Sequence, residues 1–540
     1  MNFIKPPKSV LFSTLLFLHS FLIVSQEIPQ DWHLLDKQKQ NVVGVSLKQA
    51  NELLKSKDKT AQPVIVAVLD SGVDIEHEDL KAIIWTNSKE KANNGKDDDG
   101  NGYIDDLNGW NFIGNTKGES LIAETLELTR LYRSYKNKFQ NKDKFSISPE
   151  EKKDYQYYLS LKKEYEDAYE KLYKRLSSIE EEYAFFNQLV PPLQKAMKKE
   201  VFSADELMSF NPTDQGHQKL KITFLNILNR NEGLTPEKLI KHYQDTKGNK
   251  EETEMRLNHN YSLDFNGRKL IGDKYTDLTE KYYGNPDVTK RSEHGTHVSG
   301  IIAAIRDNTT GIEGIANKVI IMPIRNTPMG DETDKDVANG IRYAVDNGAK
   351  IINMSFGKSY SPNKQIVDEA VRYAQKKGVL LIHGAGNDNM NTDLYYNYPS
   401  ALMEDGTVVS NWIEVGASSA YADERLAADF SNYGKKSVDI FAPGVDIFST
   451  LPGNEYGTRS GTSMAAPVVT GIAALLLSNF PELTPEEIKE IILESGVSYT
   501  IDVTIPGGDE KIPFSKLSKT GKVVNAYEAV KLALEKQKEK

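Results

Sequence analysis

Three polar side chains in separate segments have types that together could carry out nucleophilic catalysis. Asp70 follows the apolar run 64–69, His294 opens an apolar helical pattern, and Ser463 stands among small residues where another helical pattern begins. A serine hydroxyl attacks a carbonyl carbon when a histidine takes its proton and a carboxylate orients that histidine. The order Asp, His, Ser along the chain is that of one known type of serine triad.

Each of these residues also has a simpler explanation. Asp70 taken alone fits a turn at the end of a strand, and Ser463 or Thr462 fits a helix N-cap. His294 and His297 are three positions apart and could face a zinc ion, but no HExxH motif or nearby third ligand accompanies them. We therefore expect His297 to be structural and His294 to be the general base.

Three motifs surround these residues: VIVAVLDSGVDIEHEDL around Asp70, HGTHVSGIIAA around His294 and GTSMAAPVVTGIAALL around Ser463. In these stretches the chain resembles the subtilisin-like serine peptidases, or subtilases, of peptidase family S8. The resemblance covers about 61–114 and 281–536. It implies a serine endopeptidase that hydrolyses peptide bonds, in which Ser463 attacks, His294 transfers the proton and Asp70 stabilises the imidazolium.

The resemblance also implies residues that hold the substrate. Asn387, in the motif GAGND, matches the asparagine that stabilises the oxyanion together with the Ser463 N–H. An extended peptide would add as a strand beside Ser355, Phe356 and Gly357. Ala385 and Gly386 would form the opposite wall of the first specificity pocket. Asp393 near the pocket floor would favour Lys or Arg, unless it is a solvated loop carboxylate.

An acidic loop with the sequence DDDGNGYIDD resembles the start of a calcium loop. Positions 1, 3, 5 and 9 offer oxygen ligands from Asp97, Asp99, Asn101 and Asp105. Position 12 is Asn108 instead of Glu, so the EF-hand pattern is incomplete, although Asp106 could substitute. We expect a structural calcium ion here; the alternative is a solvated turn. Asp79, by resemblance, matches a calcium ligand of many subtilases.

The elements that must position these residues form an α/β pattern. Short apolar runs alternate with helical patterns, at residues 64–69, 319–324, 350–354, 379–382, 412–415 and 438–441. Such continuous apolar strands predict a subtilisin-like, mainly parallel sheet covered by helices on both faces. Ligands bind at the carboxyl ends of the strands in such sheets, which is where Asp70 stands.

Residues 115–280 differ from the rest, being rich in Lys, Glu and Tyr, and we expect an all-α insertion there. The apolar stripe from Tyr158 to Phe186 has helical spacing, and a capping box at 148–151 precedes it. We expect Pro191-Pro192 to end this helix. Further helix starts follow at Ser203 and Thr235, which suggests an antiparallel hairpin with shorter helices.

The insertion separates Asp70 from His294 by 224 positions, so both its ends must lie near these residues. We therefore hypothesise that it borders or gates the cleft. A charged, solvated decoration is the alternative for the insertion. For the whole chain, the alternative function is a catalytically restrained binding or scaffold protein that uses the insertion.

Composition and the N-terminus limit the possible chemistry, partners and cellular location of the protein. The 540 residues carry a formal net charge of −10 and no cysteine, which excludes disulfides and thiolate chemistry and argues against a nucleic-acid partner. Two lysines and the apolar run 10–24 predict a signal peptide over residues 1–25, with an uncleaved anchor as the alternative. We expect a secreted or periplasmic protein without stable membrane insertion after cleavage, acting on proteins or peptides.

These patterns divide the chain into five parts. We expect the signal peptide 1–25, an N-terminal extension 26–60, the first part of the catalytic domain 61–114, the helical insertion 115–280 and the second part 281–540. The extension is too short for an inhibitory pro-domain, and its residues 45–55 have a helical pattern.

Overall fold

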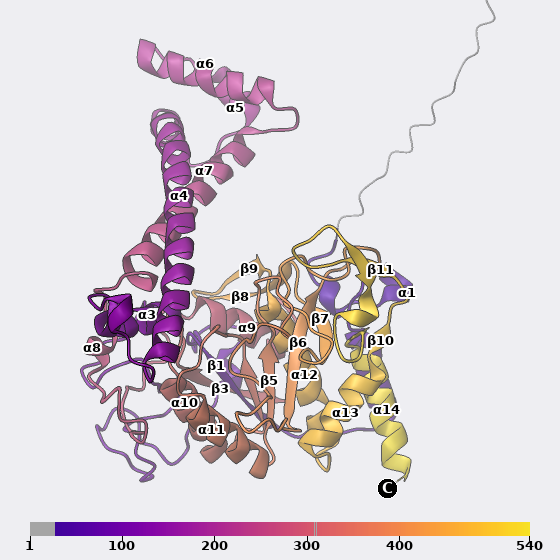
Figure 1. Ribbon diagram of the computed structural model, residues 1–540. Helices are drawn as coiled ribbons and strands as arrows, with labels where there is room; N and C mark the ends of the chain where they lie inside the picture. Colours follow the sequence, from indigo (N-terminus) through magenta and orange to yellow (C-terminus); the bar gives the residue numbers. More distant parts are fainter. Residues whose placement is uncertain (1–27, 307, 309, 540) are drawn as a thin grey trace, which may run out of the picture.

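A computed structural model describes residues 28–306, 308 and 310–539, so the predicted signal peptide lies outside the described residues. Its centre is a nine-stranded sheet with the order β10-β13-β7-β6-β5-β4-β1-β3-β2 (Figure 1). The strands are β1 Val64–Asp70, β2 Trp110–Asn111, β3 Val319–Arg325, β4 Ile351–Met354, β5 Leu380–Gly384, β6 Trp412–Ser418, β7 Ile440–Pro443, β10 Val497–Ser498 and β13 Lys522–Val523. All pairings are parallel except that of β10 with β13.

All six predicted apolar runs are strands of this sheet, and helices cover both of its faces, which confirms the predicted fold class. In β1, Val66 and Val68 pack on one face, while Ala67 and Leu69 pack on the other. The first face carries α2 Leu47–Ser56, α9 Glu293–Ala303, α12 Thr462–Asn479, α13 Pro485–Ser495 and α14 Ala526–Glu539. The second carries α10 Asp334–Asp346 and α11 Lys364–Lys376.

The remaining small elements lie at the edges of this body. They are the 3-10 turn Trp32–Leu34, α1 Lys37–Gln40, the hairpin of β8 Ile447–Leu451 with β9 Glu455–Arg459, and the hairpin of β11 Asp502–Thr504 with β12 Lys511–Pro513. Helix α12 is long and apolar enough to cross a membrane, but 89% of it is buried inside the protein. It is therefore the central core helix of the domain.

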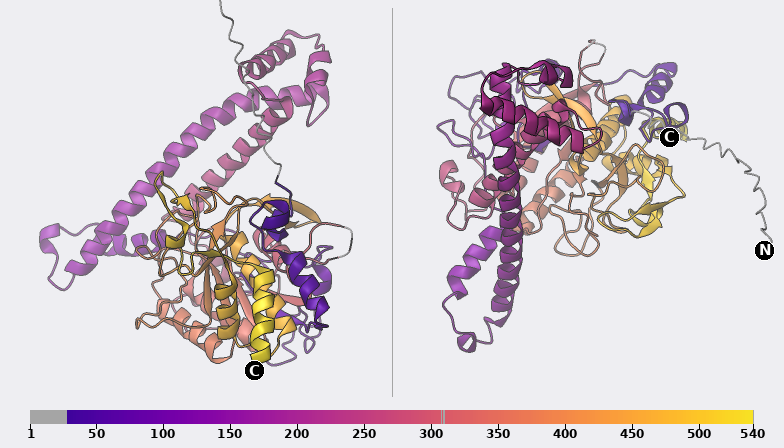
Figure 2. Two further views of the ribbon diagram at one scale, coloured as in Figure 1. Left: turned by 90° about the vertical axis from the view of Figure 1, so that its right-hand side faces the viewer. Right: turned by 90° about the horizontal axis from the view of Figure 1, so that it is seen from above.

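The insertion is helical, as predicted, and projects from the body as a long hairpin (Figures 1 and 2). Helix α4 runs outward and α7 returns beside it, with α5 and α6 at the far end. The helices are α3 Glu127–Phe139, α4 Lys152–Met197, α5 Ala204–Ser209, α6 Gln215–Arg230, α7 Pro236–Met255 and α8 Arg268–Ile271, with a π-helical turn Arg256–Asn260 after α7. Ser203 and Thr235 are N-caps, which confirms both predicted starts.

The prediction that Pro191-Pro192 ends the long helix is wrong, because α4 continues to Met197. A proline inside a helix costs about 3 kcal/mol through its lost hydrogen bond and ring clash. Here Leu189, Val190 and Leu193 are buried in a separate apolar cluster at the far end of the hairpin. Burial of these side chains on both sides of the prolines offsets that cost, so tertiary packing overrides the local signal.

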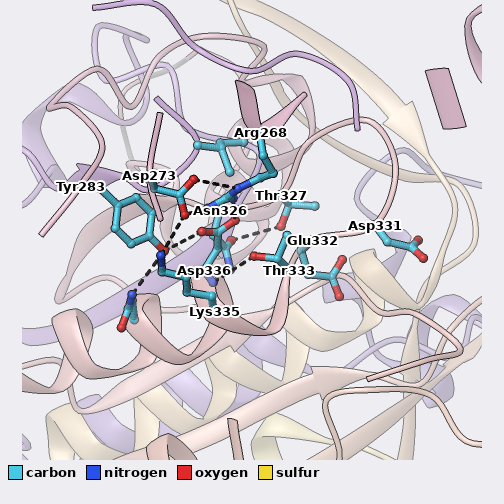
Figure 3. A network of polar contacts seen from close by, with 12 residues as sticks. Arg268, Asp273, Tyr283, Asn326, Thr327, Asp331, Glu332, Thr333, Lys335 and Asp336 are labelled. Atoms are coloured by element: carbon cyan, nitrogen blue, oxygen red, sulfur yellow. Dashed lines mark hydrogen bonds and ion pairs between the residues drawn. The ribbon is translucent and has the colours of Figure 1, made fainter. Parts of the chain in front are cut away.

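A buried ionic network fixes the returning end of the insertion to the first turn of α10 (Figure 3). Arg268 contacts Asp336 at 2.6 Å and Asp273 at 2.6 Å. Lys335 contacts the same Asp273 at 2.9 Å, and the Tyr283 hydroxyl donates to Asp336 at 2.7 Å. The base of the insertion is thus tied to the segment that leads from β3 into α10.

Candidate active site

Asp70 and His294 form the first half of the site. Asp70 ends β1, is 1% exposed, and its Oδ1 accepts hydrogen bonds from His294 Nδ1 at 2.7 Å and from the Ser71 N–H at 2.6 Å. Burial lowers the pKa of His294, but the Asp70 carboxylate outweighs this effect, so the net pKa is raised. The pair therefore has the geometry of a base whose orientation and charge a buried carboxylate controls.

Two glycines allow α9 to come this close to the end of β1. A Cβ on Gly295, the residue after His294, would lie 2.1 Å from the Gly72 carbonyl oxygen and 3.2 Å from Asp70 Cβ. Gly72 has a φ of +115°, which L side chains rarely adopt, and its own Cβ would lie 2.4 Å from the Val288 carbonyl oxygen. The motif HGT thus has a steric reason for its glycine.

Ser463 stands in the first turn of α12, beside the segment that directly follows β4. Its hydroxyl donates to the Ser355 carbonyl at 3.1 Å, and the Ser355 hydroxyl donates to the Ser463 carbonyl at 3.0 Å. Ser355 lines one cleft together with Asp70 and His294. The sheet order β5-β4-β1 explains this meeting, because these neighbouring parallel strands end at the same edge.

Asn387 lies close to the start of α12. Its Oδ1 accepts from the Thr462 N–H at 2.8 Å and from the Thr462 hydroxyl at 3.0 Å. Both bonds go to the oxygen, so the amide nitrogen of Asn387 stays available as a donor. Thr462 directly precedes Ser463, so the serine and this amide are held by the same turn.

The two predicted walls of the specificity pocket face each other across Asn397, which the sequence analysis missed. A Cβ on Gly357 would lie 2.5 Å from Asn397 Oδ1, and a Cβ on Gly386 would lie 3.3 Å from its Nδ2. The Asn397 amide also donates to the Gly384 carbonyl at 3.3 Å. Ala385, between Gly384 and Gly386 in the sequence, is fully buried. The available signal was the position of Asn397 directly before Tyr398-Pro399-Ser400.

Asp393 lines a second pocket together with Asn397, whereas Ser355, Phe356 and Gly357 line the cleft that contains Asp70 and His294. Its carboxylate accepts from the Lys436 N–H at 2.9 Å, and from the Ser437 N–H at 2.9 Å and hydroxyl at 2.8 Å. These bonds hold two loops together. The preference for Lys or Arg that Asp393 would give therefore stays a prediction.

The acidic loop gathers a different set of carboxylates from the predicted one. Oxygen atoms of Glu90, Asp99 and Asp106 all lie within 4.8 Å of one another. Glu90 Oε2 is buried and has no hydrogen-bond partner among the described residues. Burial raises the pKa of Asp106 to about 6. Three crowded carboxylates with an unpartnered oxygen suit a calcium ion, which prefers carboxylate ligands.

Of the predicted ligands, Asp99 belongs to this set, and so does Asp106, which was considered as a substitute at position 12. Asp97 accepts from the N–H groups of Gly100 and Gly102, and Asp105 accepts from those of Asn94 and Gly95. Asn101 accepts from the Tyr103 N–H and donates to Asp106 at 3.0 Å. These three residues shape the loop around the cluster.

Asp79 lies elsewhere and is fully buried. Its carboxylate accepts from the Asn308 amide at 2.5 Å, the Tyr456 hydroxyl at 2.9 Å and the Ile312 N–H at 3.4 Å. Protein donors thus surround it on three sides.

Comparison with known proteins agrees with this geometry. Residues 61–512 match the Subtilase family, peptidase family S8. The chain is 42% identical over 216 residues to a thermophilic serine proteinase of Bacillus sp. (strain AK1), covering 40% of this chain and 48% of that protein. It is 39% identical over 216 residues to thermitase of Thermoactinomyces vulgaris, covering 38% and 72%.

Among solved structures, a cold-adapted subtilisin-like serine proteinase aligns with a TM-score of 0.35 and 31% identity, covering 42% of this chain and 76% of that one. The chain spans about half the length of the Bacillus sp. (strain AK1) relative. The family match, in contrast, extends across the insertion to both parts of the sheet domain. The chain therefore belongs to the subtilase family of subtilisin-like serine peptidases.

Proposed function

We propose that this chain is a serine endopeptidase that hydrolyses peptide bonds of proteins or peptides. The observation that carries the proposal is the bond between Asp70 and His294 in the cleft lined by Ser355, the residue bonded to Ser463. His294 takes the proton of the Ser463 hydroxyl as this oxygen attacks the carbonyl, and then gives it to the leaving amine. Asp70 stabilises the imidazolium that forms between these steps.

The negative charge on the tetrahedral intermediate is met by two donors. These are the Ser463 N–H at the start of α12 and the Asn387 amide, whose oxygen is fixed by Thr462. Such donors stabilise the charge because they are oriented before it develops. The N-terminus of α12 adds its positive dipole end at the same place.

The acyl part of the substrate adds as a strand beside Ser355, Phe356 and Gly357. The residue whose carbonyl is attacked then places its side chain between this strand and Ala385-Gly386, next to Asn397. A neutral amide at this position would bind neutral side chains in preference to Lys or Arg.

The insertion borders the cleft at its base. Ile122 lines the cleft, and the following Ala123 forms a parallel bridge with Met329. We assign the hairpin the role of limiting access for large proteins, because it projects from the body (Figure 2) and belongs to the insertion that lines the cleft at Ile122.

Glu90, Asp99 and Asp106 would hold a structural calcium ion, which would neutralise their mutual repulsion. The proposed signal peptide over residues 1–25 would direct the protein to the periplasm or the exterior. The absence of cysteine fits such a location, because no stray disulfide can form there.

Hydrolysis of a protein substrate, followed by mass spectrometry of the products, tests the proposal. Wild type should release peptides from casein, and Ser463→Ala should lose this activity while keeping its melting temperature. Equal hydrolysis by both proteins, or none by a folded wild type, would refute the proposed function.

A further inference from the structure

A buried carboxylate that the triad does not use lines the catalytic cleft. Glu332 is 1% exposed, and its Oε1 has no hydrogen-bond partner among the described residues. It lines the same cleft as His294 and Ser355. Figure 3 shows its carboxylate without any dashed contact to the residues drawn around it. A carboxylate in such a place costs free energy unless a cation or donor reaches it.

The two buried cations that contact the Glu332 backbone carbonyl are already committed to other acceptors. Lys358 Nζ contacts Glu127 at 3.0 Å and Asp334 at 2.8 Å, and it donates to the Glu332 backbone carbonyl at 3.0 Å. Arg130 binds both carboxylate oxygens of Glu127, at 3.1 and 2.6 Å. Its remaining bonds go to the backbone carbonyls of Thr125, Asp331 and Glu332. Within the part of the chain that the structure describes, the Glu332 side chain therefore forms no salt bridge.

These same bonds close one end of the groove. Lys358 directly follows Gly357, the last residue of the segment beside which the substrate is proposed to bind. Glu332 belongs to the segment between β3 and α10, and the bond from Lys358 to its backbone carbonyl joins the two segments. Arg130 and Glu127, from α3 of the insertion, lie behind this bridge. Lys358 comes three positions after Ser355, which corresponds to about 10 Å of extended chain. The groove thus has room for two or three residues on the acyl side before it meets Glu332.

Burial raises the pKa of Glu332, against the opposing effect of Lys358. A bound cation would favour the ionised carboxylate and lower this pKa. Two exposed arginines, Arg291 and Arg459, also line the cleft. The charge of Arg459 lowers the pKa of His294, so it acts at the end of the cleft where Asp70 and Glu293 also lie.

We propose that Glu332 is a specificity-determining residue that binds a protonated amine of the substrate, two or three residues before the scissile bond. The proposal rests on the proposed peptidase function. The amine can come from a lysine side chain within a longer peptide or from the free N-terminus of a short one. Both present the same ammonium group to the same carboxylate.

Matched peptides test this proposal on the full chain. Starting from one cleaved sequence, the second and the third residue before the scissile bond are replaced in turn by lysine or by its uncharged analogue norleucine, all with acetylated N-termini. A second series keeps neutral side chains, is truncated to two or three residues before the bond, and has a free or an acetylated N-terminus. Values of kcat/KM are measured for wild type, Glu332→Gln and Glu124→Gln.

We expect at least one charged peptide to be cleaved about tenfold or more faster than its neutral partner by wild type. Glu332→Gln should lose this preference, so that its kcat/KM values for the charged and the neutral peptide of each pair become nearly equal. Glu124→Gln is the matched control, because Glu124 is also buried with an unpartnered oxygen but does not line the cleft. It should keep the preference. A preference in the lysine series identifies the side chain as the source, and one in the truncated series identifies the N-terminus.

Equal cleavage of charged and neutral peptides by wild type, or an unchanged preference in Glu332→Gln, would overturn the proposal while leaving the peptidase function intact. Failure of wild type to cleave any peptide would overturn both. Binding of the same peptides to Ser463→Ala, measured by calorimetry, gives a readout independent of turnover. The charged peptide should bind more tightly there, and equal binding would count against Glu332.

Discussion

At the scale of single residues, the account depends on how Asp70 sets the behaviour of His294. The base must be neutral to accept the serine proton, and the 2.7 Å contact with Asp70 raises the pKa of His294. A raised pKa means that activity falls as the pH decreases through a value above 6.5, the ordinary value of histidine. Activity should therefore be highest above neutral pH.

Asp70→Asn should lower kcat/KM about 10⁴-fold at neutral pH, a magnitude borrowed from another serine peptidase fold. Without the carboxylate, the pKa of His294 should also decrease, so the acid limb of the pH profile should move to lower pH. The measurement is kcat/KM against pH for both proteins. An unchanged acid limb in the variant would show that Asp70 does not control the base.

Some residues of the site could be predicted from the sequence and others could not. Asp70, His294, Ser463 and Asn387 stand in motifs, so their grouping could be predicted. Asn397 and Glu332 do not belong to a recognisable motif. Only the fold places Asn397 beside Gly357 and Gly386 and places Glu332 in the catalytic cleft. Glu90 lies before the calcium-like loop, so a pattern that starts at Asp97 cannot include it.

At the scale of elements, the site requires α9 to pack directly against the end of β1. Gly295→Ala would put a methyl group 2.1 Å from the Gly72 carbonyl oxygen, so the helix must shift. We expect a loss of stability of about 1–3 kcal/mol and a decrease of about 10²-fold in kcat/KM, because His294 moves with the helix. Denaturant unfolding and peptide hydrolysis measure the two effects.

Gly248→Ala in α7 is the matched control, since an added Cβ at Gly248 meets nothing within 4 Å. This change should stabilise the helix by up to about 1 kcal/mol and leave hydrolysis unchanged. Wild-type activity in Gly295→Ala would contradict the steric argument.

Helices and strands that are buried in the central core were predicted well. Very short strands and the end of α4, which packs in a separate cluster, were not. The six apolar runs are strands because they are buried on both faces. The short strands β2 and β10 have two residues each and leave no periodic pattern. Helix α4 passes Pro191 because a separate apolar cluster holds it there, which no local rule contains.

At the scale of the whole molecule, two buried histidines should make the fold sensitive to acid. Burial lowers the pKa of His33 to about 4 and that of His297 to about 3. Unfolded histidine titrates near 6.5, so the unfolded chain binds these protons first and the free energy of unfolding decreases as the pH falls from about 6.5 toward 4.

At pH 5, each histidine should account for about 2 kcal/mol of this loss. His33→Gln should therefore weaken the dependence of the unfolding free energy on pH between 6.5 and 5. Denaturant unfolding at several pH values measures this slope. A slope equal to that of wild type would show that His33 does not contribute.

Calcium would stabilise the whole domain through the loop that packs Asp106 against Tyr343 of α10, which donates to it at 2.7 Å. Removal of calcium with EGTA should lower the melting temperature by roughly 5 °C. Glu90→Gln should melt lower in calcium and lose most of the response to EGTA. Asp79→Asn, at the separate site, should keep that response. A wild-type melting curve unchanged by EGTA would contradict the calcium assignment.

The central claim is that Ser463 is a nucleophile activated by His294. Labelling of the full chain with a fluorophosphonate probe, followed by mass spectrometry of its peptides, tests this claim most directly. The account predicts a single adduct on Ser463, absent from Ser463→Ala and formed much more slowly in Asp70→Asn. No adduct on folded wild type, or an adduct that persists in Ser463→Ala, would contradict it.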